Sequence, residues 1–235
     1  MTRCGAVIVA AGRGTRMGTA ESKQFLLLRG KPILVHTLER FQRMELIEAI
    51  VLVTGEADLA RCRSYVTEYG LTKVTAVVAG GSERQHSVRL GLERLPAGIE
   101  VAAVHDAVRP FASSARVAAC LHKAYETGGA VLAVPVKDTI KVVDSSGRIE
   151  ATPERRSLWA VQTPQAFRLE LLLEAHARAV RDSFVGTDDA MLVERLGIPV
   201  HVVEGDYTNI KITTPDDLLW AERLLDEQGE RGGEQ

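Results

Sequence analysis

A glycine-rich, basic loop follows the first apolar run of the chain. The run Ala6–Val9 leads directly into the segment Ala10–Lys23, in which one arginine separates Gly12 from Gly14. Glycine reaches backbone angles that other residues avoid, so successive amide groups of such a loop can point into one concavity and bind phosphate. The loop also carries three cations, Arg13, Arg16 and Lys23. We therefore expect a nucleoside triphosphate site here; an ordinary turn between a strand and a helix is the alternative.

The spacing of this loop differs from that of two commoner phosphate-binding loops. A Walker A loop needs Gly-x-x-x-x-Gly-Lys-Ser/Thr, and neither Lys-Ser nor Lys-Thr follows Gly18. The dinucleotide-binding fingerprint needs a third glycine at the position of Met17, one residue before Gly18. The sequence therefore indicates neither a Walker-type nucleotidase nor a dinucleotide-binding enzyme.

A second glycine pair, Gly80-Gly81, comes after another apolar run and before a predicted helix. In open parallel sheets ligands bind at the carboxyl ends of the strands, where this segment falls. Backbone amides here, with the hydroxyl of Ser82 or Ser87, are candidates to bind a ligand. The alternative is a plain turn in which Ser82 caps the helix.

The segment His105–Pro110 also follows an apolar run. Asp106 is the best-placed carboxylate for a magnesium ion on triphosphate oxygens, because magnesium prefers oxygen ligands and keeps several waters, so one or two protein contacts suffice. Arg109 either holds phosphate or braces Asp106 in an ion pair. We interpret His105 as a histidine packed at a strand end. The residues form neither a zinc-binding His/Cys set nor a Ser-His-Asp nucleophile signature.

Three later segments place polar groups at the ends of predicted elements: Asp138-Thr139, Thr187–Asp189 and Asn209–Lys211. In a half-buried strand, alternation would direct Lys211 into the crevice, where it would anchor a second phosphate; an exposed lysine on a sheet face is the alternative. Thr187 is predicted to cap a helix and is able to bind a hydroxyl as well. Pro215, followed by two aspartates, indicates the start of another helix.

Length, composition and charge favour one large α/β domain that acts on a small molecule. The chain has 235 residues, of which 46% are hydrophobic and 26% charged, a balance that buries a core and leaves little room for disorder. The net charge of −2 argues against nucleic acid or an anionic membrane as a partner. Any phosphate binding must therefore come from local clusters of positive charge.

The cysteines and the N-terminal segment suggest a cytoplasmic protein. Cys4, Cys62 and Cys120 form no Cys-x-x-Cys pair, which suits packed thiols in a reducing compartment. The early apolar run, Ala6–Ala11, is interrupted by Gly12-Arg13 and lacks a cleavage region. We therefore expect neither a signal peptide nor a transmembrane helix.

Short β-branched runs alternate with stretches of helical spacing along the whole chain. This βαβ pattern predicts a doubly wound, mainly parallel sheet with helices on both faces and right-handed crossovers. The expected strands are Ala6–Val9, Ile50–Thr54, Val74–Val78, Val101–Val104, Val131–Val136 and Val200–Val203.

Helix boundaries can be predicted from proline, serine and glycine. Pro32 is expected to open a helix whose buried stripe is Ile33, Leu34, Thr37, Leu38 and Phe41. A further helix is expected after Glu56, and another from Ser113 or Ser114 to the glycines at 128–129.

One stretch, Lys137–Thr163, breaks this rhythm. Its Asp144–Gly147 segment is typical of a hairpin loop, and the polar residues at 153–156 do not suit a buried strand. We predict a protruding β-arm at about residues 137–163, which either covers the active site or joins a partner subunit.

These motifs, taken together and in order, resemble the 2-C-methyl-D-erythritol 4-phosphate cytidylyltransferases of the non-mevalonate isoprenoid pathway. The resemblance runs from Val7 to about Leu225. The matching segments are the Ala-Ala-Gly-x-Gly-x-Arg-Met loop at Ala10–Met17, Gly80–Arg84, His105–Pro110, Leu-Trp-x-x-x-Thr-Pro-Gln at Leu158–Gln165 and Asn-Ile-Lys at Asn209–Lys211. The family usually has proline before Lys23 and aspartate after Gly81, where this chain has Ser22 and Ser82.

The resemblance implies a Rossmann-like nucleotidyltransferase domain over residues 1–228, the arm included. From its own residues, which include Gly232-Gly233, the segment 229–235 is expected to be a disordered tail. It implies that Arg16 and Lys23 stabilise the transition state, that Asp106 assists Mg²⁺ or another divalent cation, and that Arg155 and Lys211 position the methylerythritol phosphate. The implied nucleotide-binding residues are Ala10, Ala11, Gly12, Gly14, Gly81, Ser82, Ser87, Asp106, Ala107 and Arg109. The implied substrate-binding residues are Thr139, Arg155, Thr187 and Lys211.

The expected reaction joins CTP to the polyol phosphate and releases pyrophosphate. The family's arm arginine, matched by Arg155, reaches across a dimer, so a homodimer is expected. Two other functions stay open at this point. A ribitol 5-phosphate cytidylyltransferase would use the same chemistry on another polyol phosphate, and a non-catalytic nucleotide-binding module would keep the fold without turnover.

Overall fold

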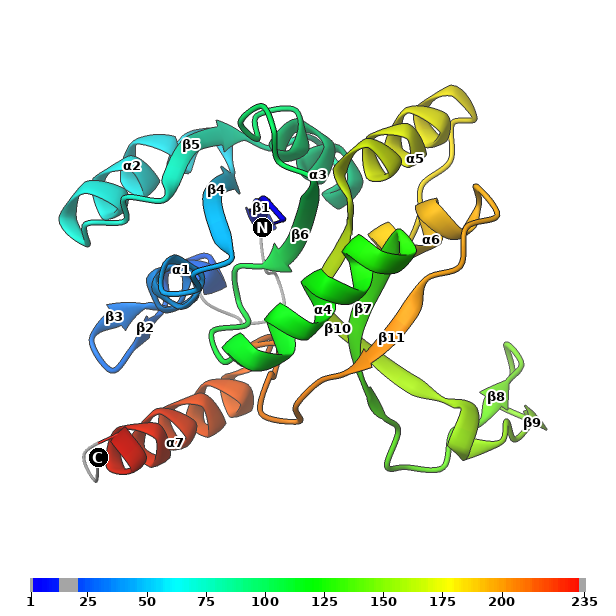
Figure 1. Ribbon diagram of the computed structural model, residues 1–235. Coiled ribbons are helices and arrows are strands. Elements are labelled where there is room, and N and C mark those ends of the chain that lie inside the picture. Colours follow the sequence, from blue (N-terminus) through cyan, green and yellow to red (C-terminus); the bar gives the residue numbers. More distant parts are fainter. Residues whose placement is uncertain (1, 13–20, 233–235) are drawn as a thin grey trace.

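The computed structural model describes residues 2–12 and 21–232. In this part of the chain seven strands form one twisted sheet, ordered β11-β7-β10-β6-β1-β4-β5 (Figure 1). They are β1 (Cys4–Ala10), β4 (Ile47–Thr54), β5 (Val74–Ala79), β6 (Val101–Asp106), β7 (Gly129–Pro135), β10 (Trp159–Arg168) and β11 (His201–Glu204). Every apolar run that we predicted as a strand is one, which confirms the α/β fold class.

The strand that sequence patterning missed is β10, which lies in the middle of the sheet. It runs antiparallel to both neighbours, β6 and β7, whereas all other neighbouring pairs in this sheet are parallel. Its apolar residues are interrupted by Gln162–Gln165, so the run has neither continuous apolar character nor simple alternation. These interrupting side chains are nevertheless buried, and tertiary hydrogen bonds satisfy them.

Helices cover both faces of the sheet. One face is covered by α1 (Ile33–Gln42), α2 (Leu59–Glu68) and α4 (Ser114–Thr127), and the other by α3 (Arg84–Leu92), α5 (Leu169–Arg181) and α6 (Asp189–Glu194). The last helix, α7 (Pro215–Gly232), packs on a smaller apolar cluster with the short strands β2 (Leu27–Leu28) and β3 (Lys31–Pro32).

The sequence patterns explain how individual helices pack on the sheet. Helix α1 starts after Pro32, and its predicted stripe is fully buried: Ile33, Leu34, Thr37, Leu38 and Phe41. Helix α3 approaches β1 so closely that a Cβ atom at Gly91 would collide with Val7. Helix α4 follows Ser113 and ends at Gly128, whose φ of 99° few other residues adopt.

Two predicted helix boundaries require correction. Ser82 is not the cap of α3, because the helix starts at Arg84 and Glu83 occupies the N-cap position. Helix α7 extends to Gly232, so residues 229–232 of the expected tail are helical, and residues 233–235 lie outside the described range. The predicted start of α7 is confirmed, since the Asp217 carboxylate accepts hydrogen bonds from the backbone amides of Thr213 and Thr214.

The predicted arm is present as a small two-stranded hairpin beyond the main sheet (Figure 1). It comprises β8 (Val142–Val143) and β9 (Ile149–Ala151), and Asp144 stabilises its turn by accepting hydrogen bonds from Ser146 and Arg148. The arm is shorter than predicted, because β10 returns the chain to the main sheet at Trp159. Within the described residues, no helix combines the length and apolar character needed to cross a bilayer.

Candidate active site

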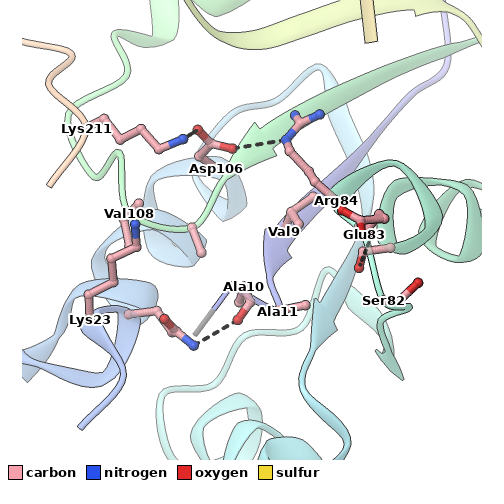
Figure 2. Close-up of a pocket in the computed structure, with 14 residues that line it drawn as sticks. Val9, Ala10, Ala11, Lys23, Ser82, Glu83, Arg84, Asp106, Val108 and Lys211 are labelled. Carbon is pink, nitrogen blue, oxygen red and sulfur yellow. Dashed lines mark hydrogen bonds and ion pairs between the residues drawn. The ribbon is translucent and has the colours of Figure 1, made fainter. Parts of the chain in front are cut away.

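A pocket of about 410 Å³ opens at the carboxyl edge of the sheet, where β1 and β6 end and α3 begins (Figure 2). Its lining draws on segments that are far apart in the sequence. The residues that line it are Val9, Ala10, Ala11, Gly12, Lys23, Gln24, Ser82, Glu83, Arg84, Ser87, Asp106, Ala107, Val108 and Lys211. The structure therefore brings together four segments that we predicted separately from the sequence.

The described ends of the glycine-rich segment line one wall of the pocket. Ala10, Ala11 and Gly12 line it, and the buried Gln24 side chain donates a hydrogen bond to the Ala10 carbonyl at 2.9 Å. Lys23 begins a short 3-10 helix, Lys23–Phe25, and reaches the same wall (Figure 2). The predicted residues Arg13, Gly14 and Arg16 lie outside the described residues.

The second glycine segment packs against this loop. A Cβ atom at Gly80 would lie 2.8 Å from the Ala11 Cβ, so only glycine permits this approach. The Ser87 hydroxyl accepts a hydrogen bond from the Gly81 amide and donates one to the Glu83 carbonyl, both at 3.1 Å. Ser82 and Ser87 line the pocket. Gly81 is not part of the lining, and its amide stabilises the turn through the hydrogen bond to Ser87.

Asp106 lies at the centre of a cluster of positive charge. Its carboxylate is 2.7 Å from Lys211 Nζ and 3.7 Å from both Arg84 Nε and Arg109 Nε. Burial alone would raise the pKa of this carboxyl, but Lys211 and Arg84 outweigh burial and hold the pKa well below its usual range. Asp106 is therefore ionised at any physiological pH.

Behind Asp106 a buried histidine orders the strand end. The Thr163 hydroxyl accepts a hydrogen bond from the Asp106 amide, so its own proton is directed to His105 Nδ1 at 3.1 Å. His105 Nε2 then donates to the Arg109 carbonyl at 3.0 Å. Burial lowers the pKa of His105 to about 4, which keeps the ring neutral. The prediction of a packed histidine is confirmed.

Arg109 does not line the pocket. Its guanidinium donates to the Asn209 carbonyl at 2.7 Å and approaches Asp106, and its side chain is only 12% exposed. Of the two roles weighed for Arg109, the structure thus shows the bracing ion pair, and a contact with nucleotide stays a prediction.

Lys211 reaches the pocket from an irregular segment rather than from a strand. The strand prediction for Ile210–Ile212 is wrong, because β11 ends at Glu204 and a loop continues to α7. This loop is held by Asn209, which donates to the Gln162 side chain and to the Thr163 carbonyl, and by the Ile212 amide, which donates to Val108. The prediction that Lys211 points into the crevice is confirmed (Figure 2).

The other predicted substrate-binding residues lie outside the pocket. Thr139 and Arg155 are exposed on the arm, where Arg155 donates a hydrogen bond to the Lys137 carbonyl. Thr187 is exposed before α6 and is not the cap of that helix, because Asp188 occupies the cap position and accepts from the Met191 amide at 2.9 Å. Within one chain, the described residues predicted to bind nucleotide therefore lie at or beside the pocket, whereas Thr139, Arg155 and Thr187 lie away from its lining.

Sequence reasoning singled out the segments Gly80–Arg84 and Thr187–Asp189 but gave no site role to Arg84 and did not predict its ion pair with Asp189. Arg84 lines the pocket, and its Nη1 donates to the buried Asp189 carboxylate at 2.7 Å. Burial alone would lower the pKa of Arg84, but Asp189 and Asp106 outweigh it and raise the pKa. The Gly-Gly-x-Glu-Arg motif contained the signal, since its last residue starts α3 and faces the pocket.

The pocket suits a magnesium ion that phosphate oxygens also hold, but not a metal centre built from protein ligands alone. In the described part of the chain, no three His, Cys, Asp or Glu side chains gather as potential ligands. Asp106 offers an ionised carboxylate in the lining, and one such ligand is enough when phosphates and water complete the octahedron.

Comparison with known proteins identifies the family. The sequence model of the 2-C-methyl-D-erythritol 4-phosphate cytidylyltransferases matches residues 4–227 of this chain. The chain belongs to this family. The cytidylyltransferase of this name from Geotalea uraniireducens is 50% identical over 226 residues, covering 95% of this chain and 97% of the relative. The one from Syntrophus aciditrophicus is 48% identical over 221 residues, covering 94% of each chain.

Solved structures of the family have the same fold. The 4-diphosphocytidyl-2C-methyl-D-erythritol synthase of Anaerococcus prevotii matches with a TM-score of 0.84 at 32% identity, covering 96% of each chain. The cytidylyltransferase of Thermus thermophilus matches with a TM-score of 0.78 at 35% identity, covering 95% of this chain and 98% of the other. The family thus favours an enzyme over a binding module, and methylerythritol phosphate over ribitol phosphate.

Proposed function

We propose that this protein transfers the cytidylyl group of CTP to 2-C-methyl-D-erythritol 4-phosphate, giving 4-diphosphocytidyl-2-C-methyl-D-erythritol and pyrophosphate. The observation that carries this proposal is the pocket itself. In a chain that matches the family over residues 4–227, it joins the glycine-rich loop, Lys23, Asp106 and Lys211 at one sheet edge.

The reaction is an in-line displacement at the α-phosphorus of CTP. A phosphate oxygen of the polyol phosphate forms the new P–O bond, while the bond from the α-phosphorus to the bridging oxygen breaks and pyrophosphate leaves. The attacking phosphate is already ionised near neutral pH, so no general base is needed. Catalysis then rests on alignment of the two phosphates and on stabilisation of the charge that develops between them.

Lysine side chains on two sides of the pocket supply positive charge for this step. Lys23 comes from the loop that follows β1, and Lys211 comes from the loop that precedes α7 (Figure 2). In our proposal Lys23, together with Arg16, stabilises the transition state. Lys211 breaks its ion pair with Asp106 and binds the phosphate of the second substrate. Arg84 and Arg109 then remain as the cations beside Asp106.

Asp106 is the residue that would hold magnesium. When bound, the ion would neutralise phosphate charge and favour departure of pyrophosphate. The protein's own contribution is to keep Asp106 ionised and fixed, through the cations around it and the Thr163 hydroxyl behind its amide.

In this proposal Thr139 and Thr187 contact the polyol, and Arg155, with Lys211, positions its phosphate. Arg155 is exposed on the arm, away from the pocket lining of its own chain, which supports a homodimer in which the arm serves the partner subunit. Exposed apolar side chains on the same arm, Ile140, Val142, Val143 and Ile149, support burial against a second copy.

A cytoplasmic location and a small phosphorylated substrate are part of this proposal. Cys4, Cys62 and Cys120 are buried thiols, which supports a cytoplasmic location. With a net charge of −2, the chain is suited to a small phosphorylated substrate rather than to nucleic acid.

Pyrophosphate release from CTP and Mg²⁺ tests the proposal, with methylerythritol 4-phosphate and ribitol 5-phosphate assayed in parallel. We expect faster turnover of the methylerythritol substrate. Faster turnover of ribitol 5-phosphate would reassign the substrate. CTP binding without pyrophosphate release from either would support a binding module instead.

A further inference from the structure

The loop that carries Thr187 is hydrogen-bonded to α3, the helix whose first turn lines the nucleotide pocket. Gln85 lies in the first turn of α3 and is only 6% exposed. Its amide nitrogen donates to the Phe184 carbonyl at 3.0 Å, and its amide oxygen accepts from the Gly186 amide at 2.9 Å. One glutamine therefore satisfies both a carbonyl and an amide of the loop between α5 and α6.

The neighbouring residue, Arg84, also bonds to the segment around the start of α6, and it lies on the side that faces the pocket. Its guanidinium donates to Asp189, which is 1% exposed, while its Nε lies 3.7 Å from Asp106 (Figure 2). Arg84 thus faces both the nucleotide pocket and the start of α6. Gln85 is absent from the pocket lining, and both of the side-chain hydrogen bonds described above go to the loop.

A third contact comes from β10. The Gln165 side chain accepts hydrogen bonds from the Asp189 and Ala190 amides and donates to Asp188 at 2.9 Å. Buried polar side chains whose donors and acceptors are all matched favour one arrangement of the backbone over its alternatives. The loop before α6 is therefore fixed relative to α3 and to β10 at once.

We propose that Gln85 is a positioning residue for the polyol phosphate, which acts by holding the Thr187 loop at a set place beside the nucleotide pocket. This inference rests on the proposed function, because it takes Thr187 as a contact of the second substrate. Since in-line transfer requires the polyol phosphate to face the α-phosphorus, a displaced loop weakens binding and alignment of that substrate while the CTP wall stays intact.

The variant Gln85→Met tests this role, because it keeps the length of the side chain and removes both hydrogen bonds. We expect the KM for methylerythritol 4-phosphate to rise about tenfold. The dissociation constant for CTP, measured by calorimetry without the second substrate, stays within about twofold of the parent value. Gln85→Glu keeps the acceptor for the Gly186 amide and should fall between the parent and Gln85→Met.

The chain offers a matched control in Gln42. Its side chain donates to the Gly70 carbonyl and accepts from the Lys73 amide, so it joins a helix to a loop by the same pair of bonds at the opposite edge of the sheet. Gln42→Met is expected to lower the Tm and to leave both substrate constants unchanged.

Two results would overturn the positioning role: a Gln85→Met enzyme that loses only Tm, as Gln42→Met does, or one in which the constants for CTP and polyol phosphate rise equally. If Gln85→Met does not fold, the same criteria apply to Gln85→Glu. The parent enzyme keeps the two proposals apart, because a parent without turnover of methylerythritol 4-phosphate contradicts the proposed function itself.

Discussion

The pocket and the arm handle their polar residues in opposite ways. In the pocket, Asp106 has three cations within 3.7 Å, and Asn209, Thr163 and His105 lock the loops behind it. On the arm, polar contacts are local and exposed, such as Asp144 with Ser146 and Lys141 with Thr152. The pocket is therefore ordered by contacts across the chain, and the arm by contacts within itself.

This difference separates two kinds of functional residue. Side chains of the pocket acquire their geometry from the folded core of one chain. Among the described residues of its own chain, the Arg155 guanidinium donates a hydrogen bond to the Lys137 carbonyl, and the side chain remains exposed. In the proposed homodimer a partner subunit would cover such a residue, so the comparison predicts different outcomes for substitutions in the two regions.

The largest effect is expected from Lys23→Ala. Removing one cation that stabilises a transition state costs about 100-fold or more in kcat. Steady-state pyrophosphate release measures the loss, and Lys31→Ala is the control, because Lys31 pairs with Glu39 away from the pocket. Near-normal turnover by Lys23→Ala would remove this lysine from catalysis.

Arg155→Ala tests whether the arm acts across a dimer. We expect a loss of at least about tenfold in turnover, while the neighbouring Arg156→Ala, whose guanidinium pairs with Glu154, keeps full activity. Mixing Arg155→Ala with Lys23→Ala, after exchange of subunits, should restore about a quarter of the parent activity, because half of the dimers then hold one unaltered site. An active parent that stays monomeric, or no recovery on mixing, contradicts the dimer proposal.

Asp106→Asn sharpens the picture of the pocket. The change leaves Lys211, Arg84 and Arg109 without their shared counter-charge and removes the carboxylate proposed for magnesium. We expect turnover to fall about tenfold and the magnesium concentration for half-maximal activity to rise. Glu83→Gln, on another part of the lining, is the control. An unchanged magnesium requirement would exclude Asp106 as a ligand.

The smallest effect concerns pH and the buried histidine behind Asp106. Burial lowers the pKa of His105 from 6.5 to about 4. Between pH 6.5 and pH 4, this histidine is therefore protonated in the unfolded chain and neutral in the folded chain. The stability of the folded state is therefore complete above about pH 6.5 and is lost as the pH falls towards 4, by about 3 kcal/mol.

Thermal unfolding of the parent and of His105→Gln at pH 7 and pH 4.5 measures this effect. The decrease in Tm should be larger for the parent. The Asp106 and Asp189 carboxyls, whose pKa values are lowered from 3.8, stabilise the fold at both of these pH values and lose that stabilisation mainly as the pH falls below about 4. Equal decreases in the two proteins would show that His105 does not control this transition.

The sequence predicted those parts of the fold that depend on local patterns. The strands of the parallel sheet are continuous apolar runs, and the stripe of α1 repeats at helical spacing, so neighbouring residues carry the signal. The glycine-rich loop, Asp106 and the direction of Lys211 were predicted for a similar reason, since each lies in a short segment at the end of an element.

The errors occurred where distant partners decide the structure. The first half of β10 was assigned to the protruding arm, because the hydrogen bonds of Thr163 and Gln165 to Asp106 and Asp188 cannot be seen in the sequence. The caps of α3 and α6 were each misplaced by one residue, since several adjacent polar residues suit a cap. Arg84 was not assigned to the site because its partner, Asp189, is about a hundred residues away in the chain.

The antiparallel direction of β10 has a consequence for the position of the arm. Strand β7 ends at the carboxyl edge of the sheet and β10 begins there, so the chain between them leaves the sheet and returns to it at the same edge at which the pocket opens. Residues 136–158 therefore form an insertion that lies outside the main sheet. A change in their length or sequence would leave the pairing of the core strands and the nucleotide pocket in place.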